Sequence, residues 1–594
     1  MAVHSFHIPV MGIGFTVDTP VRVAQYGISS VISLVDDMLI EKMRAFHCKK
    51  MNLPFVAIGK KEADFRARRI TSYLNLMDQI VKKKFEALKA APFEKGSRII
   101  RYLEMLPEDS KLKHVYHQLL QTKDRETVKK MQNWLRAHVS VGSIDVNIMT
   151  KLDKVNYKGE EELPVAYNDA HAALRGFARS DLHASIVLSA GINTRLYGYM
   201  AQFEDFYPDE NGFLKKGIIL KVSDYRSALT QGKFLAKRGL WVSEYRIESG
   251  LNCGGHAFAS DGYLMGPILE EFKAHKEELI HVTHGLLIQA LKHKNKPFRE
   301  TPSDLKITVQ GGITTCKEQS FLFEYYNVVS VGWGSPFLLV PEVSNVDPTT
   351  LRLLSEAREE DLYLSDISPI GVPFNSLRGN TKDAEKQRLI ESGRPGSACP
   401  KKYLVSNKEF TERAICTASR QYQHKKIKEL EQKSLDRKEH ERALSKIVEK
   451  SCICVGLGTA ALLVNDLDTA TEGKAVSVCP GPTIAYFSKI ASLREMVDHI
   501  YGRISIIDEG DRPNMFIKEL DMYVDYLRNM VAESIKPLRE KQIKYFKSFQ
   551  NNLQEGIDYY KNLFADVMEE SKSVKDALLS ELEKREKAIF CIQF

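Results

Sequence analysis

The chain has 594 residues, of which 43% are hydrophobic and 27% charged, and its formal net charge is +8. This composition is typical of a globular protein rather than a disordered one, and the length exceeds what a single hydrophobic core usually needs. The charge excess is small for this size, and Lys and Arg concentrate in one late segment, which argues against a nucleic-acid-binding protein.

Three features concern the compartment. No apolar stretch reaches the ~18 residues needed to span a bilayer, so no membrane partner is expected. Residues 1–7 contain neither the basic nor the apolar segment of a signal peptide. The nine cysteines are scattered along the chain, which is typical of reduced thiols in a cytosolic protein. We therefore expect a cytoplasmic protein.

Eight β-like segments alternate with helical segments along the first 340 residues or so. Such alternation implies parallel strand pairing with right-handed crossovers, and eight units is a number that closes a barrel. The sequence therefore predicts the α/β class, a (β/α)8 TIM barrel with a helical insertion and a mostly helical C-terminal extension. The expected strands are 7–15, 28–34, 139–149, 184–189, 217–222, 240–247, 305–309 and 328–331.

The domain boundaries follow from changes in composition. Residues 1–345 are expected to form the barrel, with a helical insertion at about 36–136 that is too long for a barrel connection and could serve as a lid. Residues 346–486 contain Pro, Gly and Cys and should pack on the barrel; within them, 421–450 is predicted as a charged, solvated helix. Residues 487–594 are predicted as helices that pack on the body or on a second subunit, which would give a homo-oligomer.

Glycine turns mark the candidate phosphate site. Gly254-Gly255-His256 places a proton-exchanging side chain beside two residues that let backbone approach a ligand. Gln310-Gly311-Gly312 and Gly332-Trp333-Gly334-Ser335 each follow a β-like run, as the phosphate loops after the last two strands of such barrels do. Tight structural turns would explain these glycines equally well.

Other candidates lie where predicted strands end, because barrel enzymes place their chemistry at the carboxyl ends of strands. Met11, Gly12 and Asn147 are among them, and Asn147 can both donate and accept hydrogen bonds. Lys221 follows an apolar run, so its ammonium could stabilise negative charge above the barrel. A lone lysine in such a place is usually solvated, and a lone histidine such as His256 is often structural.

Five of the nine cysteines lie between residues 399 and 479, at positions 399, 416, 452, 454 and 479. The spacing C-x-C is not the usual C-x2-C pattern of zinc or iron–sulfur ligands, and no second tight pair follows. Buried thiols that pack in the interior are the ordinary interpretation, so no metal is expected.

The chain resembles the nitronate monooxygenase-like (2-nitropropane dioxygenase-like) family of FMN-dependent TIM barrels. It is most similar to long variants related to the enoyl reductase subunits of polyunsaturated fatty acid synthases. The residues that carry the resemblance are 9–14, 146–148, Lys221, 254–256, 311–313, 334–335, 365–374, Cys399-Pro400 and 452–457.

The resemblance implies that FMN lies on top of the barrel. Met11, Gly12 and Asn147 would line its ring, and Lys221 would lie near the N1–C2=O edge. His256 would be the general base or acid. Gly311, Gly312, Gly334 and Ser335 would bind the phosphate group, and Gln310 and Gly332 would be further cofactor-binding residues. Cys253 before the glycine pair, Phe258 after it and the bulky Trp333 depart from the family pattern, and these departures leave the substrate open.

Several functions are consistent with these residues. An FMN-dependent oxidoreductase could remove a proton next to a nitro group and react with oxygen. Alternatively, it could take hydride from NAD(P)H and reduce an activated double bond. A non-flavin phosphate-binding barrel enzyme could use Lys221 as a Schiff base. A scaffold for a partner protein and an iron–sulfur flavoprotein are further alternatives. A small-molecule substrate is expected in each enzymatic case, with no nucleic acid.

Overall fold

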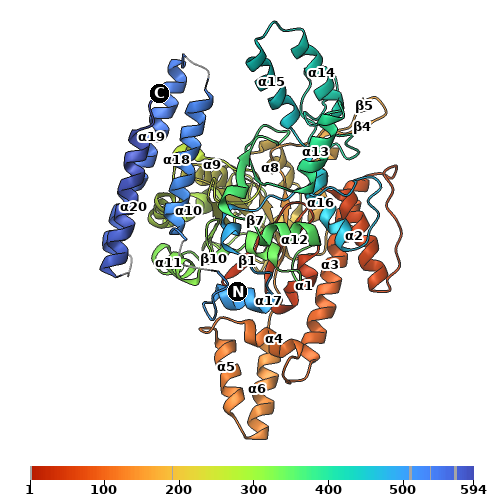
Figure 1. The fold of residues 1–594 in the computed structure, drawn as a ribbon. Coiled ribbons are helices and arrows are strands. Elements are labelled where there is room, and N and C mark those ends of the chain that lie inside the picture. Colours follow the sequence, from red (N-terminus) through yellow and green to blue (C-terminus); the bar gives the residue numbers. More distant parts are fainter. Residues whose placement is uncertain (1–2, 190, 508–511, 535–536, 568–570) are drawn as a thin grey trace.

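The barrel predicted from the sequence lies at the centre of the molecule (Figure 1). The computed structural model describes residues 3–189, 191–507, 512–534, 537–567 and 571–594. Eight parallel strands form one closed barrel, and the last strand pairs with the first, Phe6 opposite Val331. These strands are β1 (Phe6–Ile8), β2 (Ser29–Ser33), β3 (Ile144–Ile148), β6 (Ala184–Leu188), β7 (Lys216–Val222), β8 (Glu244–Glu248), β9 (Lys306–Gln310) and β10 (Ser330–Gly332). The (β/α)8 prediction is confirmed.

Strand ends differ from the sequence-based expectation in ways that matter for the site. The first strand was expected over 7–15, but β1 ends at Ile8, because Pro9 has no N–H to donate to a neighbouring strand. The chain then turns at Gly12, whose φ of +53° lies in the left-handed region. In contrast, β8 extends one residue beyond the expected end and includes Glu248.

Inside the barrel the side chains form layers, since alternate residues of a strand point inward. Val31, Val187 and Ile219 form an apolar cluster separate from the main core, and Val10 packs against it. Two residues further along β2, β6 and β7, at the carboxyl end, the inward side chains become polar. This end carries Ser33, Asn147, Ser189, Lys221, Glu248 and Gln310.

Helices surround the barrel, as the alternation of elements requires. They begin with α1 (Thr19–Val23), which has Pro20 in its first turn. Two longer helices are α9 (Tyr225–Ala236) and α10 (Met265–His293). The others are α7 (Asp169–Ala178), α8 (Thr194–Met200), α11 (Cys316–Tyr326) and α12 (Pro348–Ser355), and a small hairpin of β4 (Tyr157–Lys158) and β5 (Glu161–Glu162) precedes α7.

The predicted insertion is helical along most of its length. It contains α2 (Asp37–Lys50), α3 (Phe65–Ala90), α4 (Arg98–Met105), α5 (Lys111–Gln121) and α6 (Arg125–His138). On α4, Tyr102 Oη donates a hydrogen bond to Ser140 O at 3.0 Å, just before β3 begins. The helices α4 to α6 therefore lie at the amino-terminal end of the barrel, and Figure 1 shows them at the bottom of the molecule.

The segment after the barrel lies at the opposite end (Figure 1). It contains the hairpin of β11 (Leu362–Ser365) and β12 (Phe374–Leu377), followed by α13 (Thr381–Glu391). The prediction of a single charged helix over 421–450 is wrong. Two helices, α14 (Arg420–Glu431) and α15 (Arg437–Glu449), form a hairpin there. Asp436 starts the second helix by accepting a hydrogen bond from Glu439 N at 2.8 Å.

The next helix, α16 (Ile453–Val464), is apolar on all sides and buried over its first ten residues. Gly14 N donates a hydrogen bond to Leu457 O at 2.8 Å, which joins α16 to the turn after β1. A Cβ added at Gly14 would lie 2.9 Å from the backbone of Gly458, so the close approach requires glycine. In this way α16 becomes part of the wall above the barrel.

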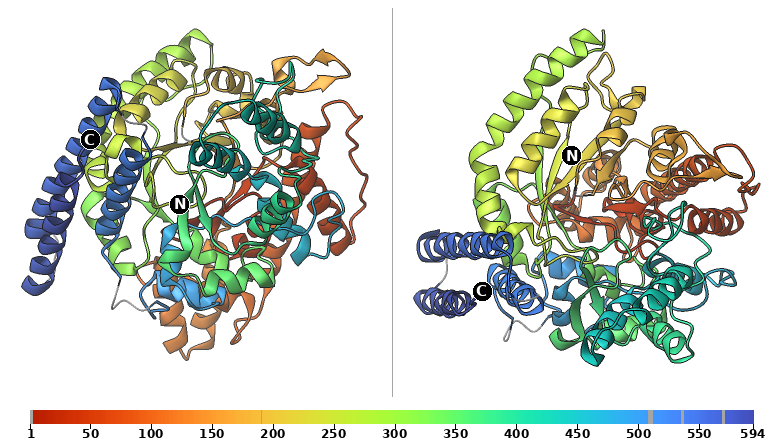
Figure 2. Two further views of the ribbon diagram at one scale, coloured as in Figure 1. Left: turned by 45° about the horizontal axis from the view of Figure 1, so that its top comes forward. Right: turned by 90° about the horizontal axis from the view of Figure 1, so that it is seen from above.

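The C-terminal helices are α17 (Leu493–Ile500), α18 (Met515–Glu533), α19 (Glu540–Asn562) and α20 (Lys572–Phe590). Figures 1 and 2 show the last three along one side of the barrel. Tyr560 Oη accepts a hydrogen bond from Gly266 N at the start of α10, so the tail packs on the body. Among the described helices, none alone is long and apolar enough to cross a bilayer; α15 and α16 meet that test only as a pair bent by 42°.

Candidate functional site

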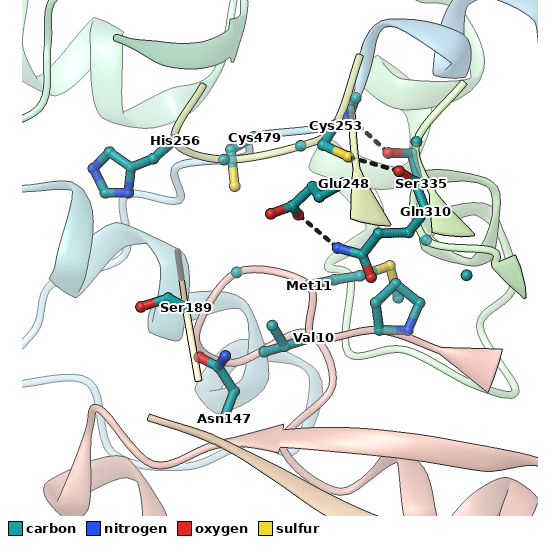
Figure 3. A pocket seen from close by; sticks show the side chains of 18 of the residues that line it. Val10, Met11, Asn147, Ser189, Glu248, Cys253, His256, Gln310, Ser335 and Cys479 are labelled. Carbon is teal, nitrogen blue, oxygen red and sulfur yellow. Dashed lines mark hydrogen bonds between the residues drawn. The ribbon is translucent and has the colours of Figure 1, made fainter. Parts of the chain in front are cut away.

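A cavity of about 240 Å³ opens at the carboxyl end of the barrel. Its walls come from the strand ends, from the loops that follow them and from the post-barrel segment. Figure 3 shows His256 on one side, and Glu248 and Gln310 on the other. The cavity is lined by all eleven residues singled out from the sequence: Met11, Gly12, Asn147, Lys221, His256, Gln310, Gly311, Gly312, Gly332, Gly334 and Ser335. Their individual roles stay predictions.

Lys221 forms an ion pair at the cavity wall. Its Nζ lies 2.8 Å from Glu248 Oε2, and Gln310 Nε2 donates to Glu248 Oε1 at 2.5 Å. Burial alone would raise the pKa of Glu248, but the charge of Lys221 and the hydrogen bonds from Lys221 and Gln310 outweigh it and lower that pKa. Glu248 is therefore a carboxylate that fixes the ammonium of Lys221 at one point of the wall.

A second basic side chain at the cavity is that of Lys151, three residues after β3. The sequence pattern did not indicate this residue. Its Nζ lies 3.8 Å from the centroid of the Phe258 ring, and it forms no ion pair with any residue that the structure describes. Burial, and then the charge of Lys221, lower the pKa of Lys151 to about 7. The described wall of the cavity thus carries the cationic side chains of Lys151, Lys221 and Arg246, and its one carboxylate, Glu248, is already paired with Lys221.

His256 is held from outside the barrel. Its Nε2 lies 2.8 Å from Oγ of Ser368, a buried residue between β11 and β12, and its backbone bridges to Phe374. Nδ1 has no hydrogen-bond partner within the described part of the chain. Burial, and then the charges of Lys151 and Lys221, lower the pKa of His256 to about 3. The imidazole is therefore neutral near pH 7.

The glycine turns lie together beside these groups. Gly311 and Gly312 have φ values of +104° and +83°, where a side chain is strained, and a Cβ on Gly312 would lie 2.8 Å from Asn252 Nδ2. In the other turn, Ser335 Oγ accepts a hydrogen bond from Gly481 N at 2.6 Å. The turn after β10 is therefore joined directly to the post-barrel segment.

Trp333, which seemed too bulky for a phosphate turn, does not line the cavity. Its indole is 1% exposed, and its Nε1 donates a hydrogen bond to Gln319 Oε1 at 2.9 Å. The ring also packs edge-on against His499 of α17. Trp333 therefore anchors the turn to the core and leaves its glycines facing the cavity.

Sequence reasoning missed several lining residues. Glu248 had a usable signal: it lies two residues after Arg246, so the inward-facing period of β8 includes it once the strand is extended by one residue. Lys151 lies in a loop and had none. Phe374, Cys454 and Leu457 lie in segments that carried the resemblance, but no pattern placed them on the cavity.

The insertion does not cover this cavity. Within the described residues, none between 36 and 138 contributes to its wall. The wall opposite the barrel comes instead from the post-barrel segment, including Phe374, Leu404 and Leu457. A lid formed by the insertion is therefore not part of this structure.

Comparisons with known proteins add little. A scan against protein-family models found no match, and a search of curated proteins found none either. Among solved structures, the chain is similar to the enoyl reductase domain of MlnA from the macrolactin biosynthesis cluster from Bacillus amyloliquefaciens, with 13% identity and a TM-score of 0.32. The match covers 76% of this chain and 88% of that one. A likeness this distant carries no argument about function.

Proposed function

We propose that the cavity binds FMN and that the protein is an FMN-dependent oxidoreductase of the nitronate monooxygenase-like type. One observation carries the proposal: glycine turns after β9 and β10, two lysine side chains and His256 line the same cavity at the carboxyl end of a closed barrel. Cavities at this end are where barrel enzymes bind ligands, and the last two strands commonly supply their phosphate loops. The resemblance in the sequence supports the same cofactor.

The residues present fit such a cofactor. Backbone N–H groups at Gly311-Gly312 and Gly334-Ser335 could hold a phosphate, with the Ser335 hydroxyl beside them. Asn252 Oδ1 is buried with no partner among the described residues, so it could accept a hydrogen bond from a hydroxyl of the ribityl chain. Lys221 and Lys151 supply positive charge for an electron-rich ring edge.

The size of the cavity sets a condition. Its volume of about 240 Å³ is below the ~300–1,000 Å³ typical of ligand pockets. The hydrogen bond from Gly481 N to Ser335 Oγ closes the phosphate end. We therefore expect the segment around Gly481 to move away from Ser335 when a mononucleotide binds.

A bound flavin would carry the electrons. The protein's part is to orient the reactants and to move a proton. Lys221, fixed by Glu248, can stabilise negative charge that develops at the ring edge. His256 can accept a proton at Nδ1 in the tautomer whose Nε2–H donates to Ser368 Oγ.

His256 is neutral near pH 7 and can accept a proton, but a pKa of about 3 makes it a weak base. An anion bound beside Lys151 and Lys221 would offset their charges and raise the pKa of His256 toward a value useful for a base or an acid. Proton transfer by His256 therefore serves the nitronate and the enoyl versions alike, and turnover separates them.

The first experiment is a titration of the purified protein with FMN, followed by its visible absorption and fluorescence. We expect saturable binding by the wild type and loss of binding by Gly312→Val, whose side chain would collide with Asn252. Gly393→Ala is the matched control, because Gly393 also has a positive φ of +68° but no atom within 4 Å of the added Cβ. A wild-type protein that leaves FMN free in solution would refute the proposal.

Turnover then separates the two redox versions. Oxygen consumption that depends on a nitroalkane or nitronate supports the monooxygenase version, whereas rapid reduction by NAD(P)H with slow reoxidation by air supports the reductase. In the monooxygenase case, we expect His256→Gln to keep FMN but lose roughly two orders of magnitude or more in turnover, the size of a general-base contribution.

A second candidate has its own observation. The pKa of Lys151, about 7, would leave much of this amine unprotonated at neutral pH, as a Schiff-base lysine requires. Lys221, considered for that role from the sequence, is engaged by Glu248 instead. Borohydride trapping of a carbonyl compound on Lys151, located by peptide mass spectrometry, in a protein that does not bind FMN would favour a non-flavin barrel enzyme.

A further inference from the structure

Three cysteine sulfurs converge beside the cavity. The Sγ atoms of Cys399, Cys452 and Cys454 all lie within 4.8 Å of one another, and none of the three is in a disulfide. Cys452 and Cys454 lie at the start of α16, and Cys399 comes from the loop between α13 and α14. Within the described residues this is the only group of His, Cys, Asp or Glu side chains with such convergence.

The spacing suits one metal ion. Thiolates bound tetrahedrally to zinc at about 2.3 Å lie about 3.8 Å from one another, so small side-chain rotations would bring these sulfurs into place. A [4Fe–4S] cluster, in which each cysteine binds a different iron, needs sulfurs that are further apart. Soft thiolate ligands select zinc or cuprous ions over magnesium or calcium.

The surroundings stabilise negative charge on the sulfurs. Lys402 N donates a hydrogen bond to Cys399 Sγ at 3.3 Å, and the positive end of the α16 dipole faces Cys452 and Cys454. A metal ion would take the place of the thiol protons.

The loop that carries Cys399 is fixed before any metal arrives. Lys401, two residues later, forms buried ion pairs with Asp36 and with Glu472, the latter at 3.2 Å. Tyr403 Oη donates hydrogen bonds to Asp36 at 3.0 Å and to Asp37 at 3.1 Å. Supporting contacts of this kind orient metal ligands and strengthen binding.

We propose that Cys399, Cys452 and Cys454 bind a single thiophilic metal ion of the zinc class. The fourth position would be filled by water or by Cys416, a buried thiol. Ile453 and Cys454 also line the cavity, so the metal would join the Cys399 loop to the cavity wall. This site is separate from the proposed flavin site and is tested without flavin.

The test is the metal content of the full-length protein purified without chelators. We expect about one zinc ion per chain in the wild type, and a loss of roughly tenfold or more in Cys399→Ser, Cys452→Ser and Cys454→Ser. Cys591→Ser, which changes an exposed cysteine near the C-terminus, should keep its zinc. X-ray absorption at the zinc edge should find three or four sulfur neighbours.

A measurement on the wild type alone covers the case in which the variants fail to fold. Alkylation mapped by mass spectrometry should spare the three cysteines when zinc is present and reach them after zinc is removed. Substitution with cobalt should give intense thiolate-to-cobalt absorption. The proposal is overturned if the purified protein contains no metal and added zinc does not change the alkylation of the three cysteines. A disulfide among the three cysteines, or iron together with acid-labile sulfide, would overturn it as well.

Discussion

The charge state of His256 is the most direct test of the site, because it is set by burial and by two lysines. In the folded protein its pKa is lowered from 6.5 to about 3, so the imidazole stays neutral from pH 8 down to below pH 5. In the unfolded chain the same side chain takes up a proton below about pH 6.5. The test therefore changes the pH from 7 to 5 and compares the free energy of unfolding of the wild type with that of His256→Gln.

The sign and size follow from proton binding. At pH 5 the unfolded state carries a proton on this histidine that the folded state lacks, so the free energy of unfolding falls as the pH falls. At about 1.4 kcal/mol for each pH unit below 6.5, the loss at pH 5 attributable to His256 is about 2 kcal/mol. His4 and His7, whose pKa values are also lowered by burial, act in the same direction and are present in both proteins.

Two assays read this out. In protein labelled on histidine, the NMR signal missing from His256→Gln should not shift between pH 8 and pH 5 in the wild type. In urea unfolding, the stability difference between the wild type and the variant should change by about 2 kcal/mol between pH 7 and pH 5. A signal with a midpoint near pH 6.5, or equal losses of stability in both proteins, would refute the reasoning.

The remaining predictions use the same methods. Lys151→Met removes one of the two positive charges that act on His256, so the pKa of that histidine should rise in the NMR titration. Glu248→Gln leaves the ammonium of Lys221 without its counter-charge and should cost about 1–3 kcal/mol in urea unfolding, less than for a fully buried pair, because the Glu248 side chain is 20% exposed. Adding Lys221→Met to that variant should recover part of the loss. Trp333→Ala removes a fully buried indole and leaves Gln319 without its donor, so it should cost about 3–5 kcal/mol, and an unchanged stability would show that the ring is not part of the core.

The barrel was predictable because its signal is local and repeated. Each β-like run is followed by a helical run, and the polar residue that ends a run, such as Lys221 or Gln310, lies at the carboxyl end of a strand. All of the predicted cofactor residues line one cavity. Glu248 was missed because the predicted end of its strand was one residue too early, and strand boundaries are where sequence patterns are least reliable.

What the sequence could not provide are the contacts between distant segments. Ser368 is 112 residues from His256, and no periodicity relates them. The burial of Lys151 depends on Phe258, which reaches it from the loop after β8. The three cysteines likewise converge from two segments that lie far apart in the sequence, the loop that carries Cys399 and the start of α16. Each of these contacts is a tertiary event and leaves no pattern along the chain.

The chemistry of the cavity depends on this packing more than on the barrel itself. Burial is the largest cause of the lowered pKa of both His256 and Lys151. Part of that burial comes from Phe374, which packs edge-on against the imidazole at 5.1 Å between ring centroids. The barrel supplies the charged groups and the glycine turns, whereas the post-barrel segment excludes the water that would otherwise restore ordinary pKa values. A neutral imidazole and a partly unprotonated lysine at neutral pH therefore require both parts of the chain to be folded against each other.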